Sequence, residues 1–216
     1  MLERLHFETR EEWLQGRAQI CGIGGSEAGA AVGLSQWTSP VELWEYKVGM
    51  KTPKDLSDNA AVQQGIKMEP AIRAFYTAAH PEYELEYYPH DILYQAERPW
   101  LFATLDGELI ERSTGRRGIF EAKDATPNGK AGWEKWSNGM LPSGYFCQLL
   151  HQMLATGYEF ARLCAFLHSL NGDITIRQYE VERCDVADSM DWLLAGETDF
   201  MRCVRTRKMP MVQLRI

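Results

Sequence analysis

The chain has 216 residues, of which 45% are hydrophobic and 25% are charged, and this describes one globular domain better than two. Its net charge of −7 and its pI of about 5.3 argue against a generic nucleic-acid-binding protein, because such proteins are usually basic. No apolar run reaches the length of a membrane span, and the charged N-terminal residues do not resemble a signal peptide. We therefore expect a cytoplasmic protein without membrane contact.

Periodic apolar residues predict four helical segments in the first third of the chain, at residues 7–20, 21–34, 38–49 and 60–80. The second segment opens with a glycine turn, and Ser26 is a candidate N-cap for its small-residue helix. In the third segment Ser39 is the predicted N-cap, Pro40 occupies the first helical position, and Glu42 completes a capping box. The fourth segment contains Pro70, which predicts a kink.

From about residue 82 the pattern changes to short apolar runs, which predict strands at residues 82–95, 101–111, 117–125, 161–170 and 173–182. A helix is predicted at 141–157, between the third and fourth of these strands, and another closes the chain at 187–208. This order predicts one α/β domain with a central mixed β-sheet flanked by helices. Its parts are a helical region at about 1–80, a sheet core at about 81–185 and a C-terminal helix at about 186–207.

The five cysteines contain no CxxC pair and are odd in number, which argues against a zinc site, an iron–sulfur cluster or a disulfide framework. A reduced, intracellular protein is the expectation. The histidines are scattered along the chain, and we interpret His151 and His168 as packed side chains without a metal role.

The stretch LDGELIERSTGRRGIFEAK, residues 105–123, carries the clearest chemistry. Two apolar runs flank a polar turn, which predicts a hairpin that brings Asp106 close to Glu121. Glu121 and Lys123 are two residues apart on a strand, so their side chains point to the same side. Two carboxylates that approach each other raise each other's pKa, and a hard divalent cation relieves this repulsion with oxygen ligands, among them the backbone carbonyl of Ala122. Lys123 would orient a water and offset charge on a phosphate, which indicates metal-assisted phosphodiester hydrolysis.

The same three side chains also have a purely structural interpretation. Asp106 and Gly107 can form a turn, and Glu121 with Lys123 can form an exposed cross-pair, since a D…ExK pattern often arises by chance. The surrounding sequence decides between the two interpretations.

The segment from Arg112 to Lys135 holds six basic and three acidic residues, which leaves a charge of −10 on the rest of the chain. A basic face on an acidic body can still attract a polyanion. At the end of this segment and just beyond it, residues 132–139 are interpreted as a loop over a DNA path, together with Lys130 and Lys135. The aromatic side chains Trp100, Trp133 and Trp136 are candidates for stacking on bases.

Five motifs, in order along residues 13–157, resemble the YqaJ/lambda-exonuclease group of phage recombination nucleases, within the PD-(D/E)xK superfamily. They are Arg17 with GIGGSEA at 22–28, SPVELWEYKVG at 39–49, GIKMEP at 65–70, LDG at 105–107 with EAK at 121–123, and YFCQLLHQMLATG at 145–157. Each motif is weak alone, but the ordered set is fairly specific. The resemblance implies a restriction-endonuclease-like core.

The resemblance also implies roles for individual residues. It implies the following set: Asp106 and Glu121 as metal-binding acids, Lys123 as catalytic lysine, Glu69 as a helix-borne acid, Gln148 with Tyr145 at the scissile phosphate, and Arg17 and Ser26 at a terminal 5′-phosphate. Each residue keeps a bland alternative: the glycine turn can be structural, Glu69 can be a solvated helix residue, and Gln152 competes with Gln148.

The function implied by the resemblance is a 5′→3′ exonuclease that degrades one strand from double-stranded DNA ends. It would use Mg²⁺, with two ions and Mn²⁺ as a substitute, and leave 3′ overhangs for a single-strand annealing protein. A trimeric ring and a bacterial or phage-infected cell are further implications. Two alternatives stay open: a structure-specific or restriction-type endonuclease on the same core, and a catalytically inert module that binds DNA ends.

Overall fold

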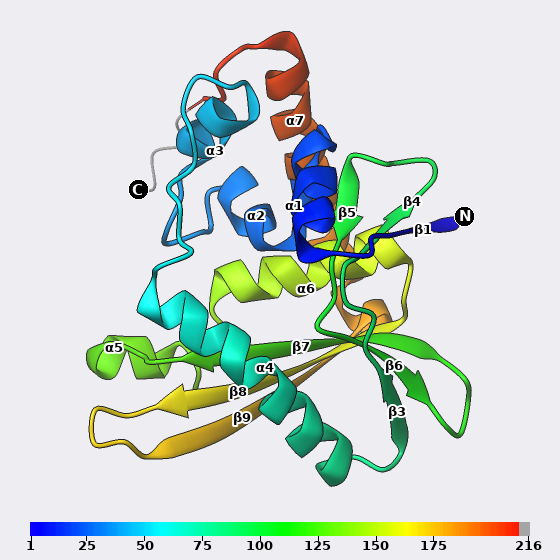
Figure 1. The fold of residues 1–216 in the computed structure, drawn as a ribbon, viewed down its shortest axis with the longest axis vertical. Coiled ribbons are helices and arrows are strands. Elements are labelled where there is room, and N and C mark those ends of the chain that lie inside the picture. Colours follow the sequence, from blue (N-terminus) through cyan, green and yellow to red (C-terminus); the bar gives the residue numbers. More distant parts are fainter. Residues whose placement is uncertain (212–216) are drawn as a thin grey trace.

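The computed structural model describes residues 1–211 (Figure 1). Its α-helices lie at Arg10–Gln19 (α1), Gly25–Ala31 (α2), Pro40–Lys47 (α3), Ala60–Ala79 (α4), Gly129–Glu134 (α5), Ser143–Thr156 (α6) and Ala187–Thr206 (α7), with a 3-10 helix at Arg183–Val186. Its strands lie at Leu2–His6 (β1), Ile23–Gly24 (β2), Tyr83–Glu86 (β3), Asp91–Gln95 (β4), Leu101–Ala103 (β5), Gly107–Glu111 (β6), Arg117–Ala125 (β7), Phe160–His168 (β8) and Ile174–Glu182 (β9). The protein is a single mixed α/β domain, as the order of predicted elements indicates.

The strands form two sheets where the sequence predicted one central sheet. A five-stranded sheet has the order β3-β6-β7-β8-β9, and a four-stranded sheet has the order β1-β4-β5-β2. The predicted strand 82–95 is broken at His90, whose φ of 65° turns the chain from one sheet into the other. The predicted strand 101–111 is likewise divided into β5 and β6, and Asp106 lies in the crossing between the two sheets.

The five-stranded sheet is antiparallel except for its central pair, β7 and β8, which runs parallel. A parallel pair needs a long crossover connection, and α5 and α6 supply it. Helix α4 covers one face of this sheet, where Ile72 and Tyr76 pack on Phe120 and Phe160. Helix α4 runs through Pro70 as one element.

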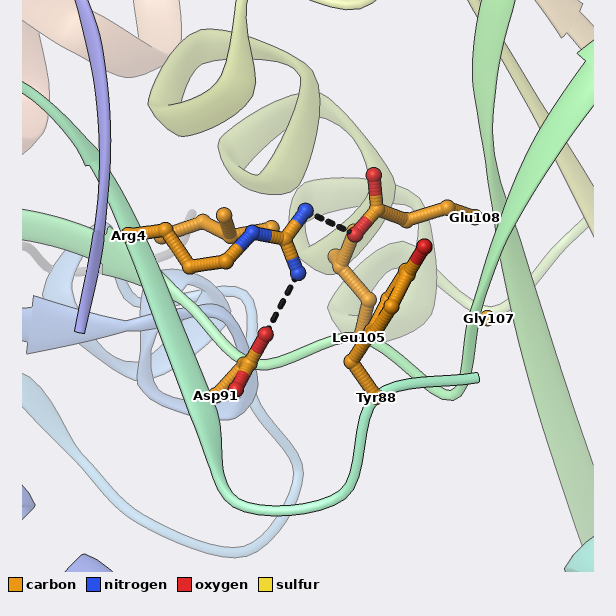
Figure 2. Close-up of a pocket in the computed structure, with 7 residues that line it drawn as sticks. Arg4, Tyr88, Asp91, Leu105, Gly107 and Glu108 are labelled. Carbon is orange, nitrogen blue, oxygen red and sulfur yellow. Dashed lines mark hydrogen bonds and ion pairs between the residues drawn. The ribbon is translucent and has the colours of Figure 1, made fainter. Parts of the chain in front are cut away.

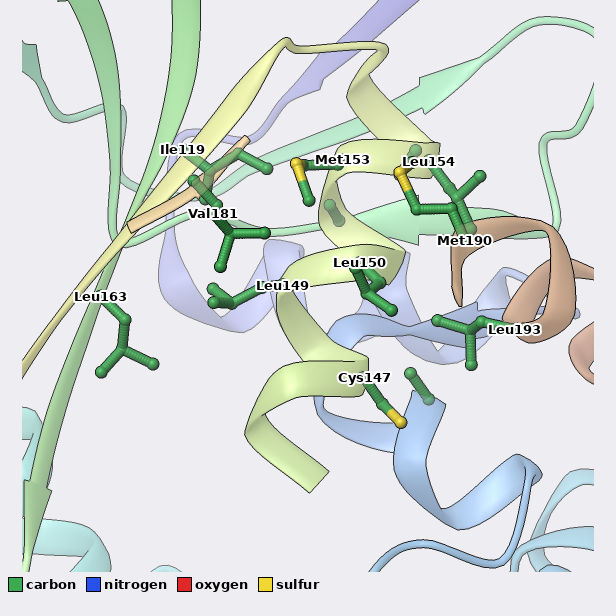
Figure 3. Close-up of a cluster of buried hydrophobic side chains, with 14 of the residues drawn as sticks. Ile119, Cys147, Leu149, Leu150, Met153, Leu154, Leu163, Val181, Met190 and Leu193 are labelled. Atoms are coloured by element: carbon green, nitrogen blue, oxygen red, sulfur yellow. The ribbon is translucent and has the colours of Figure 1, made fainter. Parts of the chain in front are cut away.

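Helix α6 covers the opposite face and lies between the five-stranded sheet and a layer made of α2, α7 and the four-stranded sheet (Figures 1 and 3). Leu149, Leu150 and Met153 are fully or almost fully buried. In Figure 3 they point in different directions, toward Ile119 on β7 and toward Leu193 on α7. A helix buried on all sides is the centre of the core, so the polar side chains it carries need partners.

Two capping predictions were wrong. Strand β2 pairs with β5 as far as Gly24, so helix α2 begins at Gly25, and its N-cap is Gly24 and not Ser26. Ser39 caps α3 as predicted, but the Glu42 carboxylate accepts a hydrogen bond from the Tyr46 hydroxyl at 2.7 Å and does not reach back to close a capping box.

Strand β1 was not predicted. It is an edge strand of mostly exposed, charged residues that pairs with β4, and such a strand lacks the apolar alternation that marks a buried one. Among residues 1–211, the longest helices are too polar to cross a lipid bilayer.

Candidate active site

The β6–β7 hairpin brings Asp106 to the strand that carries Glu121 and Lys123. Gly107 pairs with Phe120, so Asp106 lies at the open end of the hairpin. Asp106 Oδ2 accepts a hydrogen bond of 2.9 Å from the N–H of Ala122. The N–H and C=O of a strand residue point to the same side. The carbonyl of Ala122 therefore faces the same edge, where β6 has ended.

Glu121 lies at the centre of the cluster, and its side chain is 2% exposed. One oxygen, Oε1, accepts from Lys123 Nζ and from Gln148 Nε2, both at 2.6 Å. The other, Oε2, accepts from Gln152 Nε2 at 2.7 Å. Gln148 and Gln152, which sequence reasoning treated as competitors, thus both hold the Glu121 carboxylate, one at each oxygen.

Lys123 is the cation of this cluster. Its ammonium lies 5.0 Å from the centre of the Tyr145 ring, which faces it from helix α6. Burial alone would lower the pKa of Lys123, but the carboxylates of Glu121 and Asp106 outweigh burial and raise the pKa above its ordinary value. Lys123 is therefore charged at neutral pH.

The carboxylates are not fully neutralised. Burial raises the pKa of Asp106 well above its ordinary value, and the negative charges of Glu121 and Glu69 raise it further, against the attraction of Lys123. Burial also raises the pKa of Glu69, and Glu121 adds to this effect while Arg73 and Lys123 oppose it. Three carboxylates thus share two cations, and the excess of negative charge is what a divalent cation would relieve.

Sequence reasoning missed Arg73 on helix α4. Its guanidinium donates a hydrogen bond of 3.2 Å to the carbonyl of Asp106 and lies 4.0 Å from the carboxylate of Glu69. It also stacks over the ring of Tyr87, 3.8 Å from the ring centre. The i,i+4 spacing of Glu69 and Arg73 was a signal for their pairing, but not for the contact with Asp106.

The donor set fits a magnesium ion. Within residues 1–211, no group of three or more His, Cys, Asp or Glu side chains lies close enough together to hold a metal ion unaided. Mg²⁺ does not need one, because it commonly binds one or two carboxylates together with waters and substrate phosphates. Asp106, Glu121 and the Ala122 carbonyl offer such oxygens. In addition, Gln152 Oε1 is buried beside Glu121 and has no hydrogen-bond partner within the described residues, so it can accept from a water.

A cavity of about 670 Å³ opens onto this cluster. Its lining includes Lys123, Tyr145 and Gln148 from the cluster, Ser26 from α2, and Lys135 from the segment after α5. We refer to this cavity as the cleft. The structure thus gathers most of the residues implied by the sequence at one place.

Two of the implied phosphate-binding residues lie elsewhere. Arg17 stacks over the Trp13 ring, 4.7 Å from its centre, and lies beside Gly24 but does not line the cleft. Burial lowers the pKa of Arg17, against the attraction of Glu27. Lys130 is on the exposed face of α5, 3.8 Å from Glu134.

The glycine turn before α2 has a packing role. A Cβ on Gly25 would lie 3.2 Å from the Gln152 side chain and 3.4 Å from that of Gln148, tighter than ordinary contacts. A glycine here lets the first turn of α2 lie directly on the two glutamines that hold Glu121. This turn therefore packs against the two glutamines that hold Glu121. The next residue, Ser26, is exposed and lines the cleft.

The basic segment from Arg112 to Lys135 does not form one face. Arg112, Arg116 and Arg117 lie at the turn between β6 and β7 and form ion pairs with neighbouring glutamates. Lys123 is six residues further along β7, about 20 Å away at the rise of a strand. The prediction of one continuous basic face was wrong, because an extended strand separates its two ends.

Of the three aromatic candidates for base stacking, the structure argues against Trp136, and the roles of Trp133 and Trp100 stay predictions. Trp136 is 5% exposed and packs in the main core, and Trp133 and Trp100 are partly buried against the same core. Residues 129–134 form helix α5, so the predicted loop at 132–139 is shorter than expected.

His151 is a packed histidine, as predicted. It is fully buried and lies between Glu197 Oε1 at 2.6 Å and the carbonyl of Phe102 at 2.9 Å. His168 is partly exposed and lies 2.6 Å from Asp124 Oδ1. Asp124 points to the side of β7 away from Lys123, because neighbouring residues of a strand alternate.

A second cluster of buried acids lies between the two sheets (Figure 2). Arg4 on β1 donates to Asp91 on β4 at 2.5 Å and also to Glu108 on β6. Figure 2 shows the guanidinium of Arg4 between the two carboxylates. Glu108 also accepts from Arg117 at 3.3 Å and from the Tyr158 hydroxyl. We call this cluster the inter-sheet network, and the cavity beside it measures only about 10 Å³.

Comparison with known structures supports the fold. An alkaline exonuclease from Laribacter hongkongensis aligns over 92% of this chain and 96% of its own, with a TM-score of 0.62 and 18% identity. The same enzyme in complex with dAMP gives a TM-score of 0.57 at 20% identity, over 92% and 96% of the two chains. A phage-related exonuclease from Haemophilus somnus 129PT gives 0.53 at 12% identity, over 86% and 96%. The chain therefore shares the fold of these exonucleases.

Sequence comparison identifies the family. A curated relative, the uncharacterized protein YqaJ of Bacillus subtilis (strain 168), is 28% identical over 193 residues, which are 89% of this chain. This chain spans only 55% of the length of that relative. The family model described as a YqaJ-like viral recombinase domain matches residues 12–159, more than half of the chain. The chain therefore belongs to the YqaJ-like viral recombinase domain family.

Proposed function

We propose that this protein is a Mg²⁺-dependent exonuclease that degrades one strand of double-stranded DNA from its 5′ end and leaves 3′ overhangs. The observation that carries the proposal is the under-neutralised carboxylate cluster of Asp106, Glu121 and Glu69, which lies beside a charged lysine at a cleft. The relatives of the same fold are described as exonucleases, which supports hydrolysis at an end over cleavage within a strand.

In this proposal Asp106, Glu121 and the Ala122 carbonyl hold the metal. When bound, Mg²⁺ supplies Lewis-acid polarisation of the phosphate and lowers the pKa of a coordinated water, and a second ion can share these ligands. The two glutamines keep the Glu121 carboxylate in one orientation, since each donates to a different oxygen. A fixed carboxylate needs no reorganisation during the reaction.

In this proposal Lys123 binds the phosphate, and its ammonium group offsets the negative charge of the phosphate. In the structure its ammonium donates to Glu121 Oε1, and it lies on the wall of the cleft, where an entering phosphate is within reach. The ring of Tyr145 limits its movement from the other side. A cation held in this way offsets the negative charge that develops on the phosphate, which is the main requirement of phosphoryl transfer.

We further propose that the cleft receives a terminal 5′-phosphate. The hydroxyl of Ser26 can donate a hydrogen bond to it, and Lys135 lines the same cleft. Arg17 would have to turn away from Trp13 to take part, because its guanidinium does not reach the cleft in this structure.

The proposal extends to the assembly and the cell. We propose that the whole chain acts as one nuclease domain, that several copies close into a ring, with three copies as the expected number, and that the overhang passes to a single-strand annealing protein. We also propose that this activity takes place in the cytoplasm of a bacterial or phage-infected cell. Light scattering of the purified protein measures the number of copies directly.

The test compares linear duplexes with a 5′-phosphate and with a 5′-hydroxyl, in Mg²⁺ and in chelator. The wild type should degrade the phosphorylated duplex faster, and only with Mg²⁺, and Lys123→Ala should lose this activity while its circular dichroism spectrum stays unchanged. Covalently closed circular duplex should remain intact. Cleavage of closed circles would identify an endonuclease instead. If no duplex is degraded and calorimetry detects no Mn²⁺ binding, the protein is an inert module.

A further inference from the structure

The lining of the cleft carries two exposed apolar side chains. Trp37, in the loop between α2 and α3, is 77% exposed, and Met140, in the loop before α6, is 51% exposed. Both line the same cavity as Lys123 and Gln148. A single exposed apolar residue is ordinary, but a tryptophan and a methionine in the cleft that holds the proposed catalytic groups form an apolar subsite.

The backbone that carries Trp37 is held in place although its ring is free. The hydroxyl of Ser35 accepts hydrogen bonds from the N–H of Trp37 at 3.1 Å and from that of Thr38 at 3.3 Å. The N–H groups of Leu34 and Ser35 both donate to the carbonyl of Gly29 on α2, at 2.7 and 2.9 Å. The backbone below the indole is therefore already ordered, so the protein loses little backbone entropy when a ligand covers the indole.

The charges around the cleft select the kind of ligand. Lys123 and Lys135 line it with one carboxylate, that of Glu134, and because Lys123 is paired with Glu121, the lining favours an anion once a divalent cation offsets the carboxylate cluster. A ligand that is anionic at one end and flat and apolar at the other can contact the lysines and the apolar side chains of the cleft at the same time. A nucleotide has this form, and a volume of about 670 Å³ lies within the range of sites that enclose small ligands.

We propose that Trp37 stacks on an unpaired nucleobase of the strand whose phosphate lies at Lys123, with Met140 against the same base. This inference rests on the proposed function, because it takes the occupant of the cleft to be a DNA strand. A base inside a duplex has both faces covered by its neighbours, so only an unpaired base can use the indole. The protein should therefore bind an unpaired 5′ end more tightly than a fully paired one.

The test measures binding separately from cleavage. Fluorescently labelled duplexes carry a 5′-phosphate and two unpaired 5′ nucleotides, with normal bases in one probe and abasic residues in the other. Anisotropy is measured in Ca²⁺ without Mg²⁺ for the wild type, Trp37→Ala, Trp37→Phe and Trp192→Ala. Trp192 lies on α7 and is 54% exposed but does not line the cleft, so Trp192→Ala is the matched control for loss of an exposed tryptophan.

Trp37→Ala should weaken binding of the base-bearing probe about 5- to 150-fold, the range for loss of one base–aromatic stack, and Trp37→Phe should retain part of the affinity. The abasic probe should bind the wild type as weakly as the base-bearing probe binds Trp37→Ala, and the substitution should then have no further effect. Trp192→Ala should bind both probes like the wild type, and all variants should share one thermal midpoint.

Three results would overturn the inference. The first is wild-type affinity in Trp37→Ala, and the second is an equal loss on both probes, which would show that the indole contacts the DNA backbone or supports the fold. The third is a defect that emerges only with an added protein partner. Degradation of linear duplex by the wild type in Mg²⁺ is assayed in parallel. Active wild type with an unaffected Trp37→Ala refutes the stacking alone, whereas inactive wild type refutes the proposed function.

Discussion

Asp106 and Glu108 stand two residues apart at the start of β6, yet each joins a different buried acid pair. Glu108 and Asp91 in the inter-sheet network pair with two arginines, Arg4 and Arg117, and His6 also lies 2.7 Å from Asp91, so that each carboxylate has basic partners. Asp106, Glu121 and the nearby Glu69 share two cations, Lys123 and Arg73, so this cluster keeps an excess of negative charge.

The cavities beside the two pairs also differ in size. Asp91 and Glu108 line a cavity of about 10 Å³, whereas Lys123 and Gln148, which both donate to Glu121, line one of about 670 Å³. A buried charge is tolerated when an opposite charge pairs with it. In a structural network every carboxylate is paired in this way, so no unpaired charge remains to attract a metal ion. The comparison teaches that burial of acids alone does not mark a site. Incomplete compensation beside an open cleft does, and matched substitutions in the two clusters can test this distinction.

The largest effect is expected for Glu121→Gln. Removal of one carboxylate from the unbalanced cluster removes a metal ligand, so kcat/KM on linear duplex should fall by about 10²–10³-fold or more. The free energy of unfolding should change by less than about 1 kcal/mol, because the cluster loses repulsion with Asp106 as well as attraction to Lys123. Exonuclease assays and urea denaturation measure the two quantities. A large loss of stability would show that Glu121 is a structural residue like Glu108.

The matched substitution Glu108→Gln should do the reverse. It leaves Arg4 and Arg117 without their shared carboxylate, so the free energy of unfolding should fall by about 2–3 kcal/mol, less than for a fully buried pair because both arginines are partly exposed. At a temperature where the variant is folded, its kcat should stay near that of the wild type. Loss of activity without loss of stability would move the inter-sheet network into the active site.

A smaller effect is expected for Arg73→Met. Arg73 contacts no proposed substrate group, but it holds the carbonyl of Asp106 and the carboxylate of Glu69, so it acts as a positioning residue. Its loss should reduce kcat about tenfold and leave KM nearly unchanged, because a displaced ligand affects the reaction more than binding. Arg73→Lys keeps the charge but not the planar fork and should fall between the two. A change confined to KM would instead assign Arg73 to DNA binding.

The local parts of this site could be predicted from the sequence. The β6–β7 hairpin follows from two apolar runs around a polar turn, and the spacing of Glu121 and Lys123 fixes their common side. The helix that carries Gln148 follows from apolar periodicity. The structure brings these side chains together with Asp106, and their catalytic roles remain predictions.

What could not be predicted depends on contacts between distant segments. The division into two sheets depends on the backbone of His90, where no glycine marks the left-handed conformation. Arg73 meets Asp106 only because α4 crosses the sheet, and local spacing does not encode a crossing. The same limit explains the tryptophans: the pattern cannot tell that Trp136 is buried and Trp37 exposed, since both follow from tertiary packing.

The smallest effect concerns the stability of Asp106→Asn without metal. The pKa of Asp106 is raised in the folded protein by burial and by Glu121, whereas in the unfolded chain it is about 3.9. Between these two pKa values the folded state holds a proton that the unfolded state has lost, so the wild type loses stability as pH rises through the raised pKa. The amide that replaces the carboxyl group does not titrate, and its oxygen can still accept the hydrogen bond from Ala122. In chelator at neutral pH the variant should therefore be more stable than the wild type, by about 1 kcal/mol.

Two controls sharpen this result. The advantage of Asp106→Asn should vanish as pH falls below about 4, where the carboxyl is protonated in both states, and it should reverse when Mg²⁺ binds the folded wild type. Asp91→Asn, the matched change in the inter-sheet network, should be less stable than the wild type at neutral pH, because it removes a partner of Arg4. Urea denaturation at several pH values measures all three proteins. If Asp106→Asn is as destabilised as Asp91→Asn in chelator, the two acid pairs are equally compensated, and the cleft cluster has no excess charge to offer a metal.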